Sequence, residues 1–236
     1  MRFYFRPILS FTALMAPLFA ILIGLGVWQI ERLHWKLGLI AEVNRNLTAP
    51  PIGLDKALAM GAGAQYRHVA LEGHFENARE VYVFATGPDG AAVYHVLTPF
   101  VTTDGRMMMV DRGIVPPERR NSDTRRKGQL EGIRRIVGVW RKADPPGLFI
   151  PPADLGDHVW YARDLKLIAI TERLSLASLY LVEIDATPVP GGWPKGGQTV
   201  VTFRNEHLQY AMTWFGLAAA LLFIYFAYHR SRGRLG

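Results

Sequence analysis

Residues 8–30 read ILSFTALMAPLFAILIGLGVWQI, and this uncharged stretch decides how the rest of the chain is interpreted. As an α-helix it would be about 34 Å long, enough to cross the hydrocarbon layer of a bilayer with some tilt. A cleaved signal peptide is the alternative, because Arg2 and Arg6 precede the stretch and residues 24–26 form a small-x-small sequence. The apolar part of a signal peptide has only about 7 to 15 residues, so we predict a retained transmembrane helix.

A second uncharged stretch, residues 210–228, reads YAMTWFGLAAALLFIYFAY. It would make a helix of about 28 Å, again close to the thickness of a bilayer. Trp214 lies near one end, and Tyr225 and Tyr228 lie near the other. Because aromatic side chains favour the two membrane interfaces, we predict a second transmembrane helix here.

The charges that flank the second stretch predict its orientation. Arg230, Arg232 and Arg234 follow it directly, whereas Arg204 and Glu206 offset each other at its other end. Cytoplasmic flanks carry the excess of Lys and Arg, so the C-terminus is expected in the cytoplasm. Two spans then place the N-terminus on the same side and the segment between them outside.

We divide the chain into a cytoplasmic N-terminus (1–7), a transmembrane helix (8–30), a periplasmic domain (31–206), a second helix with an interfacial start (207–228) and a basic cytoplasmic tail (229–236). A chain of 236 residues leaves room for one ordinary domain beside the two anchors. No Arg- and Ser-rich transit segment precedes the first helix, which favours the inner membrane of a bacterium over that of a mitochondrion.

The central segment has the pattern of a β-rich domain. Residues 67–75 alternate, with Val69, Leu71, Gly73 and Phe75 on one face, as expected for a half-buried strand. Further strands are expected at 80–85, 91–102, 106–113, 132–142, 160–163 and 179–185, a helix at 164–176, and hairpin turns at 87–90 and 104–105. The fold class is therefore α+β, with two terminal transmembrane helices flanking an outward-facing domain dominated by antiparallel β-sheet.

The composition limits the chemistry that the chain can support. It has no cysteine, which excludes disulfides, thiolate metal sites and covalent c-type haem attachment. Any metal or haem ligand must then be His, Met, Tyr or a carboxylate. The net charge of +7 suits nucleic acid or anionic lipid, and because two membrane helices are expected, we assign the bilayer and no nucleic acid as partner.

The common catalytic motifs are missing, which predicts a protein that is not an enzyme. The chain has no G-x-S-x-G elbow, no Walker loop, no G-x-G-x-x-G after a strand and no H-E-x-x-H helix. A membrane-tethered hydrolase stays an alternative, and it would need a pocket that joins Asp111 and His95 to a serine.

Several polar groups have both a functional and an ordinary interpretation. His68 and His74 are too far apart on one strand for a single metal ion and are expected to be solvent-facing. The basic residues between 119 and 127 form either a docking surface for an acidic partner or a solvated loop.

His207 precedes the second stretch, where an imidazole could bind haem iron or simply satisfy its hydrogen bonds at the interface. His34 would come out at about the same depth if the two helices are antiparallel neighbours.

Short motifs spread over nearly the whole chain resemble the surfeit locus protein 1 family. They are GVWQ at 26–29, YR at 66–67 with GHF at 73–75, VDRG at 110–113 with VP at 115–116, WY at 160–161 with RD at 163–164, PGG at 190–192 with GGQ at 196–198, and FRNEHLQYA at 203–211 with TWFG at 213–216. Ile114 departs from the pattern, since family members often carry Trp there, and His34 is not part of it.

The resemblance implies an assembly factor for a haem-copper terminal oxidase, in the biogenesis of cytochrome c oxidase or a related quinol oxidase. It also implies that the protein binds haem a and helps to insert it into oxidase subunit I, with that subunit and the haem a synthesis machinery as partners. His207 matches the histidine implicated in bacterial relatives. A membrane scaffold that stabilises an assembly intermediate without touching haem is the alternative.

For a haem-binding site we expect His207 to supply an axial nitrogen to the iron. Arg204 would pair with a propionate, or else reach lipid phosphates. The other expected contacts are apolar: Trp28 and Trp214 would flank the ring, and the small residues Ala211, Gly24 and Gly26 would let it approach the helices.

Overall fold

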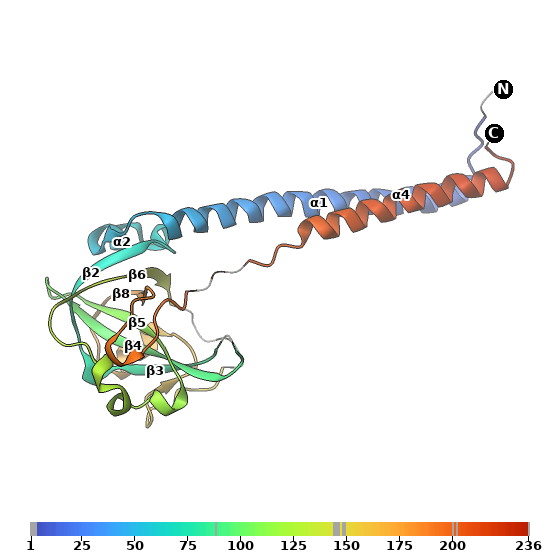
Figure 1. The fold of residues 1–236 in the computed structure, drawn as a ribbon. Helices are drawn as coiled ribbons and strands as arrows, with labels where there is room; N and C mark the ends of the chain where they lie inside the picture. Colours follow the sequence, from blue (N-terminus) through green and yellow to red (C-terminus); the bar gives the residue numbers. More distant parts are fainter. Residues whose placement is uncertain are drawn as a thin grey trace. The chain divides into compact units, whose positions relative to one another are not determined.

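A computed structural model describes residues 4–87, 89–143, 147, 150–199, 201 and 203–235 (Figure 1). The chain separates into two compact units, of which the first combines Met1–Glu42 with Thr202–Gly236 and the second is Val43–Val201. Arg2 of the N-terminal basic pair and Pro88 of the first expected turn lie outside the described residues.

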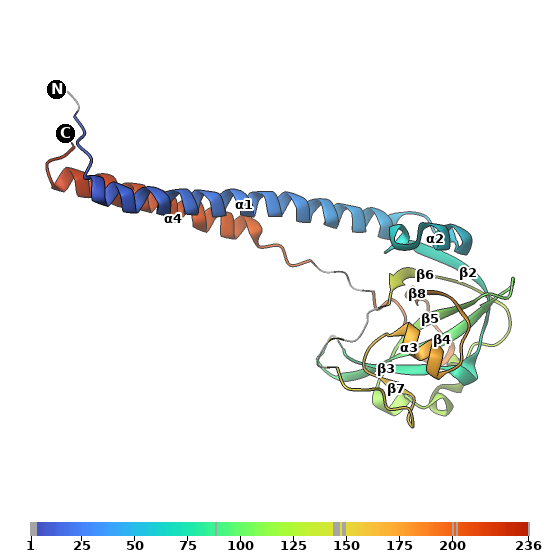
Figure 2. The ribbon, with the colours of Figure 1, turned by 180° about the vertical axis from the view of Figure 1, so that it is seen from behind.

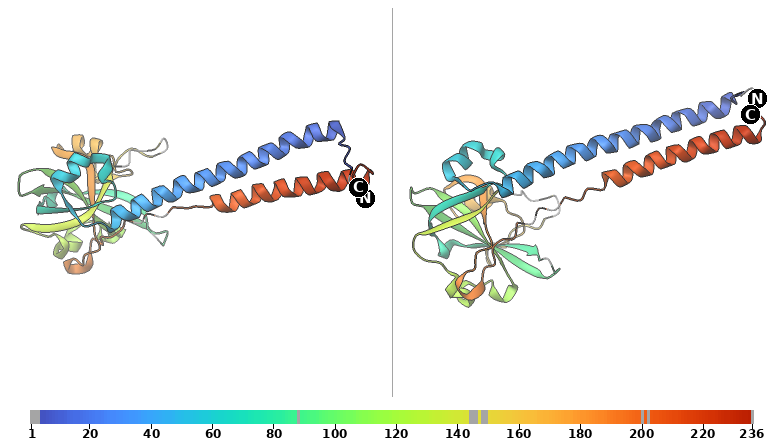
Figure 3. Two further views of the ribbon diagram at one scale, coloured as in Figure 1. Left: turned by 90° about the horizontal axis from the view of Figure 1, so that it is seen from above. Right: turned by 45° about the horizontal axis from the view of Figure 1, so that its top comes forward.

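Two long helices make up the first unit. Helix α1 spans Leu9–Thr48, and its residues from Val43 onward belong to the second unit. Helix α4 spans His207–Ser231. They run side by side in opposite directions in every view (Figures 1, 2 and 3). Both are long and apolar enough to cross a membrane, and only 6% and 11% of their most apolar stretches is buried in the protein. Such low burial is unlike the core helix of a globular domain, and it leaves apolar surface for lipid to cover.

Helix α1 is longer than the uncharged stretch that predicts it. The stretch ends at Ile30, but the helix continues to Thr48, about 27 Å further along its axis. Residues 31–48, which were assigned to the domain, are therefore helical. The boundaries of the two membrane spans stay predictions.

Polar contacts hold together one end of the helix pair, where α1 begins and α4 ends. At this end the backbone N–H of Arg6 donates to the carbonyl oxygen of Arg234 at 2.9 Å, so both ends of the chain lie together, as two antiparallel helices require. One turn further in, the backbone N–H of Ile8 donates to Nε2 of His229 at 3.0 Å, and Nδ1 of His229 donates to the Tyr225 carbonyl at 2.8 Å. His229 is fully buried, so this end of the pair is closed by a satisfied histidine.

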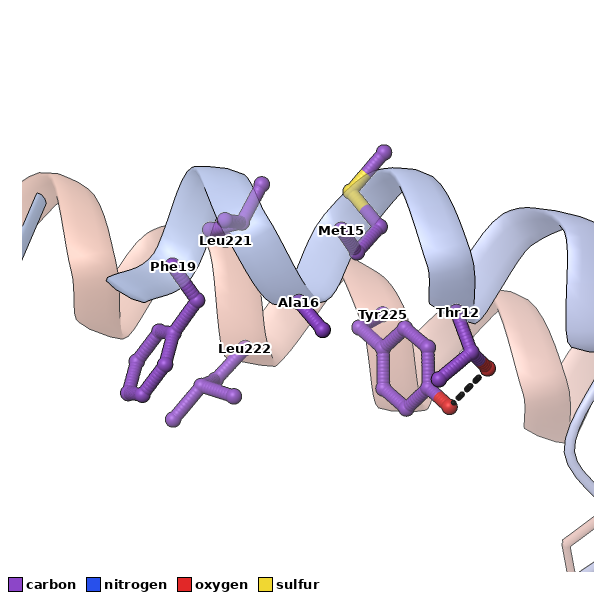
Figure 4. A pocket seen from close by; sticks show the side chains of 7 residues that line it. All are labelled: Thr12, Met15, Ala16, Phe19, Leu221, Leu222 and Tyr225. Carbon is purple, nitrogen blue, oxygen red and sulfur yellow. Dashed lines mark hydrogen bonds between the residues drawn. The ribbon is translucent and has the colours of Figure 1, made fainter. Parts of the chain in front are cut away.

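Side-chain contacts between the helices continue next to this end. The hydroxyl groups of Thr12 and Tyr225 are 2.7 Å apart and hydrogen bonded, at the edge of an apolar groove of about 200 Å³ (Figure 4). Towards the other end, the ring of Phe215 lies against Gly26, where an added Cβ would come within 2.5 Å of the ring. A glycine is therefore needed at position 26 to let the helices approach.

The second unit is built on an eight-stranded sheet that closes into a barrel. Its strands are β1 (Ile52–Gly53), β2 (His68–Phe75), β3 (Val81–Thr86), β4 (Ala92–Thr102), β5 (Met107–Val115), β6 (Arg134–Lys142), β7 (Val159–Trp160) and β8 (Leu176–Ile184). The spatial order is β1-β2-β6-β8-β5-β4-β3-β7, and β2 also pairs with β4. This extra pairing closes a five-stranded barrel of β2, β6, β8, β5 and β4.

Short helices accompany the barrel. The α-helices are α2 (Leu54–Met60) and α3 (Leu165–Thr171). There are also 3₁₀ turns at Gly61–Ala64, Asn77–Arg79, Pro117–Arg119, Ser122–Gly128 and Pro190–Gly192. Alternation along the strands divides the core in two. Met108 and Val182 point into the barrel, whereas their neighbours Met109 and Leu181 pack outside it against α3. Strand β5 is thus buried on both faces.

The expected α+β class and the mainly antiparallel sheet are confirmed. The helix expected at 164–176 is too long, because it ends at Thr171 and Leu176 already begins β8. Arg173 adopts a left-handed conformation with φ of 53°, a backbone geometry that ends helices. The sequence also gave no sign of helix α2 or of the parallel pairing of β5 with β8.

Replacing Gly73 tests the closure of the barrel. Gly73 pairs with both Arg134 and Thr102, at the point where β2 leaves β6 for β4, and a Cβ there would collide with the carbonyl oxygen of Val101. We expect Gly73→Ala to lower the free energy of unfolding by about 3 kcal/mol. Gly53→Ala, where a Cβ meets nothing within 4 Å, should change it by less than about 1 kcal/mol. Thermal unfolding of the full chain in detergent measures both, and equal effects would contradict the closure.

Candidate functional site

His207, the first residue of α4, lies against α1 and contacts a polar side chain at the end of the uncharged stretch of that helix. Its ring nitrogen Nδ1 is 2.7 Å from Oε1 of Gln29. Gln29 is only 8% exposed, and His207 is half-buried. The pair therefore sits where the apolar part of α1 ends and α4 begins.

The hydrogen bond determines which ring nitrogen of His207 is free. A side-chain amide oxygen can only accept, so Nδ1 of His207 must carry the proton and donate it to Gln29. In the uncharged ring the other nitrogen, Nε2, then keeps its lone pair. Within the described residues no hydrogen bond engages Nε2. An imidazole held in this way is suited to bind a metal.

The expected neighbours of His207 divide between two faces. Ala211 and Trp214 follow His207 by four and seven residues and share its side of α4, where Ala211 is buried and Trp214 is half-buried. Trp28 directly precedes Gln29 and is 53% exposed, so it points out of the helix pair. The structure thus groups His207, Ala211 and Trp214, and leaves Trp28 at the periphery.

Arg204 is engaged by a carboxylate of its own chain. Its guanidinium group donates to both carboxylate oxygens of Glu206, at 2.6 and 2.9 Å. The hydrogen bonds raise the pKa of Arg204 and lower the pKa of Glu206. The Arg204 side chain is 83% exposed, so the pair is open to exchange with another carboxylate.

Two expectations about the surroundings of His207 are wrong. Gln29, and not His34, is level with His207, since His34 lies about 7.5 Å further along α1 and on a different side of it. The close approach of a ring that was expected at Gly24 and Gly26 is blocked at Gly26 only. Gly26 is covered by Phe215, and a Cβ on Gly24 would meet nothing within 4 Å.

The domain brings together His95 and Asp111, the pair that the hydrolase alternative required, but the third group beside them is Arg163 and not a serine. Nδ1 of His95 lies 2.8 Å from Oδ2 of Asp111, and Arg163 lies 3.2 Å from the same oxygen. Arg163 also pairs with Glu183 at 2.5 Å, and the Thr199 hydroxyl donates to Glu183. In the part of the chain that the structure describes, no serine hydrogen bonds to His95. The triad that the hydrolase alternative needs is therefore not formed among the described residues.

Asp111 and Arg112 are neighbours on β5 and point to opposite faces. On one face, burial alone would raise the pKa of Asp111, but the charges of His95 and Arg163 outweigh it and lower the pKa. On the other face, Arg112 donates to Asn77 and to the Gly128 carbonyl. Burial lowers the pKa of Arg112 to about 10, so it stays charged at neutral pH.

A second buried ion pair includes one residue of the basic run between 119 and 127. Arg125, 1% exposed, contacts Glu80, 5% exposed, at 2.5 Å. Tyr82 donates to the same carboxylate at 2.8 Å, and burial together with the Glu80 charge raises its pKa. Neither the docking surface nor the solvated loop describes this run fully. The burial of Arg125 depends on Glu80, which lies 45 residues away in the chain, so the sequence alone does not reveal it.

Two further cations of the run form ion pairs at the surface. Arg120 pairs with Asp157 at 3.1 Å and Arg126 with Asp123 at 2.8 Å. His68 and His74 lie on the outward side of β2, and each faces a separate carboxylate, Asp185 and Glu76 respectively. Among the described residues no three His, Asp or Glu side chains gather as a metal site.

Comparison with known proteins covers both helices and the domain. The model of the SURF1 family matches residues 16–219. Surfeit locus protein 1 of Takifugu rubripes is 37% identical over 221 residues, which cover 86% of this chain and 90% of that protein. The Homo sapiens protein of the same name is 36% identical over 235 residues, covering 92% and 76% respectively. The SURF1-like protein of Rickettsia felis is 31% identical over 220 residues, covering 90% and 94%.

The buried pair of Arg125 and Glu80 should contribute strongly to stability. Glu80→Gln leaves Arg125 charged and buried beside Arg112, and we expect a loss of about 3 kcal/mol in the free energy of unfolding. Asp123→Asn removes a pair whose side chains are 79% and 68% exposed and should cost less than about 1 kcal/mol. Thermal unfolding of the full chain compares the two, and similar losses would show that Arg125 does not depend on Glu80.

The lowered pKa of Asp111 predicts that the domain loses stability in acid. Its pKa in the folded protein is lower than the ordinary value of 3.8, so its contribution to stability is complete above that value and is lost as the pH falls through the folded pKa. We expect the unfolding free energy to drop below about pH 4. Asp111→Asn should destabilise the protein at neutral pH and flatten the acid drop. The free energy of unfolding is measured against pH for the unaltered protein and for Asp111→Asn. If both lose stability equally as the pH falls, groups other than Asp111 cause the acid sensitivity.

Proposed function

The chain belongs to the SURF1 family, whose members are known as cytochrome oxidase assembly factors, and from this premise we propose how it acts. We propose that it holds haem a at the membrane interface through Nε2 of His207 and passes it to subunit I of a haem-copper oxidase. The haem is cargo, so the protein needs no catalytic group of its own.

One observation supports the haem proposal above all. His207 begins an apolar helix with Nδ1 occupied by Gln29 and Nε2 without a hydrogen bond in the described chain. A neutral imidazole that presents a lone pair is the donor that haem iron takes from histidine. The chain has no cysteine that could compete as a thiolate ligand. The donor chemistry therefore fits the cargo.

The residues around His207 suit an amphipathic cargo. Ala211 is small and Trp214 is aromatic on the same side of α4, and Trp28 can border the site from the lipid side. Arg204 already binds a carboxylate, that of Glu206, and a haem propionate is a carboxylate that can replace it. The free N–H groups at the start of α4 also favour negative charge nearby.

The membrane arrangement is part of the proposal. Helices α1 and α4 would span the bilayer, with Arg230 and Arg232 beyond the end of the second span on the cytoplasmic side. His207 would then lie at the opposite interface, and the β-barrel domain outside. The similarity to a protein of Rickettsia felis fits a bacterial inner membrane. Partners in that membrane would be subunit I and the enzymes that make haem a.

A scaffold that does not touch haem is the competing function, and one feature of the domain favours it. Helix α3 buries Leu165 and Ile168 but exposes Leu167 and Ile170, by 46% and 67%. Exposed apolar side chains next to each other suit a protein partner. The scaffold requires no haem at His207, so the two functions differ in their optical spectra.

Haem binding is tested with His207→Ala and a matched histidine. The full chain is purified in detergent from cells that make haem a, at equal expression of each variant. We expect a Soret band in the unaltered protein, its loss in His207→Ala and its retention in His34→Ala, because His34 is exposed on α1 away from the site. No band in any of the three proteins would favour the scaffold. A band that is retained in His207→Ala would show that another residue binds the iron.

A further inference from the structure

We propose that Gln29 is the positioning residue of His207, which fixes the proton on Nδ1 and so presents Nε2 to iron. The inference rests on the proposed haem-binding function and adds a residue of α1 to it. Gln29 would not touch the iron itself. It would act only through its hydrogen bond to the ring.

The burial of Gln29 is the first argument. The side chain lies within the helix pair at 8% exposure, at the end of a stretch of α1 without any charged residue. A buried amide that makes no hydrogen bond costs free energy, so its oxygen needs a donor. In the described chain that donor is Nδ1 of His207 at 2.7 Å, a distance typical of a strong contact.

The direction of this hydrogen bond is the second argument. Free imidazole can carry its proton on either nitrogen, and only the nitrogen without the proton can bind a metal. Because Oε1 of Gln29 accepts from Nδ1, the ring is held in the form that leaves Nε2 free. The same bond fixes the rotation of the ring. Partners of this kind orient metal-binding histidines and make them more basic.

A purely structural role for Gln29 must be separated from a positioning role. The bond between Gln29 and His207 also ties α1 to α4, as the bond between Thr12 and Tyr225 does at the other end of the pair. The two contacts have the same length, 2.7 Å. Thr12→Val therefore removes a comparable interhelical hydrogen bond far from His207. It is the matched control for loss of helix association.

The experiment compares the full chain in detergent with its variants Gln29→Leu, Gln29→Glu, Thr12→Val and His207→Ala. Haem a is titrated into each apo-protein, and the midpoint potential of the bound haem is measured by spectroelectrochemistry. We expect Gln29→Leu to bind haem 10- to 100-fold more weakly, as losses of such partners do elsewhere. Its potential should shift to more positive values, because a less basic imidazole stabilises ferric iron less.

The two remaining Gln29 and Thr12 variants sharpen the result. Gln29→Glu keeps an acceptor opposite Nδ1, so affinity should return and the potential should become more negative than in the unaltered protein. Thr12→Val should leave both quantities unchanged. Weaker binding by both Gln29→Leu and Thr12→Val with unchanged potentials would reduce Gln29 to a structural contact and overturn the inference.

The inference and the proposed function fail in different ways. If His207→Ala loses haem while Gln29→Leu keeps the affinity and potential of the unaltered protein, the positioning role is wrong and the haem site stands. If the unaltered protein itself takes up no haem a, both are wrong. If His207→Ala binds haem as well as the unaltered protein does, another residue binds the iron, and His207 needs no positioning residue.

Discussion

Two apolar helices gain little by meeting each other in lipid, because lipid chains are as apolar as their side chains. Close packing and a few polar contacts must therefore decide how they pair. In this chain the polar contacts lie at the two ends of the helix pair. Gln29 bonds to His207 at one end, and His229 accepts from the backbone of Ile8 near the other. Between them Gly26 admits the ring of Phe215.

The two end contacts use histidine in different ways. Both ring nitrogens of His229 are hydrogen bonded and its side chain is fully buried, so it has no free electron pair for a metal ion. His207 has the same tautomer, but only its Nδ1 is engaged in the described structure. Among the described residues the two histidines thus differ in a single hydrogen bond, which Nε2 of His229 makes and Nε2 of His207 does not.

The sequence predicts most of this architecture and little of its polar detail. Uncharged length predicts both helices, and period-two alternation predicts β2, because each pattern depends on local geometry alone. The closure of the barrel at Gly73, the role of Glu80 opposite Arg125 and the register that brings Gln29 to His207 depend on residues far apart in sequence. His207 itself was recognisable from its place before an apolar stretch. Its partner Gln29 appeared in the sequence only as part of the GVWQ motif, with nothing to link it to His207.

The tautomer of His207 in the haem-free protein tests the account most directly. The full chain is labelled with nitrogen-15 in its histidines, and the His207 signals are assigned by their loss in His207→Ala. We predict that Nδ1 of His207 is protonated and that Nε2 has the chemical shift of an unprotonated nitrogen. A ring protonated on Nε2 with Nδ1 bare would contradict the account, because Gln29 could then not be holding Nε2 ready for iron.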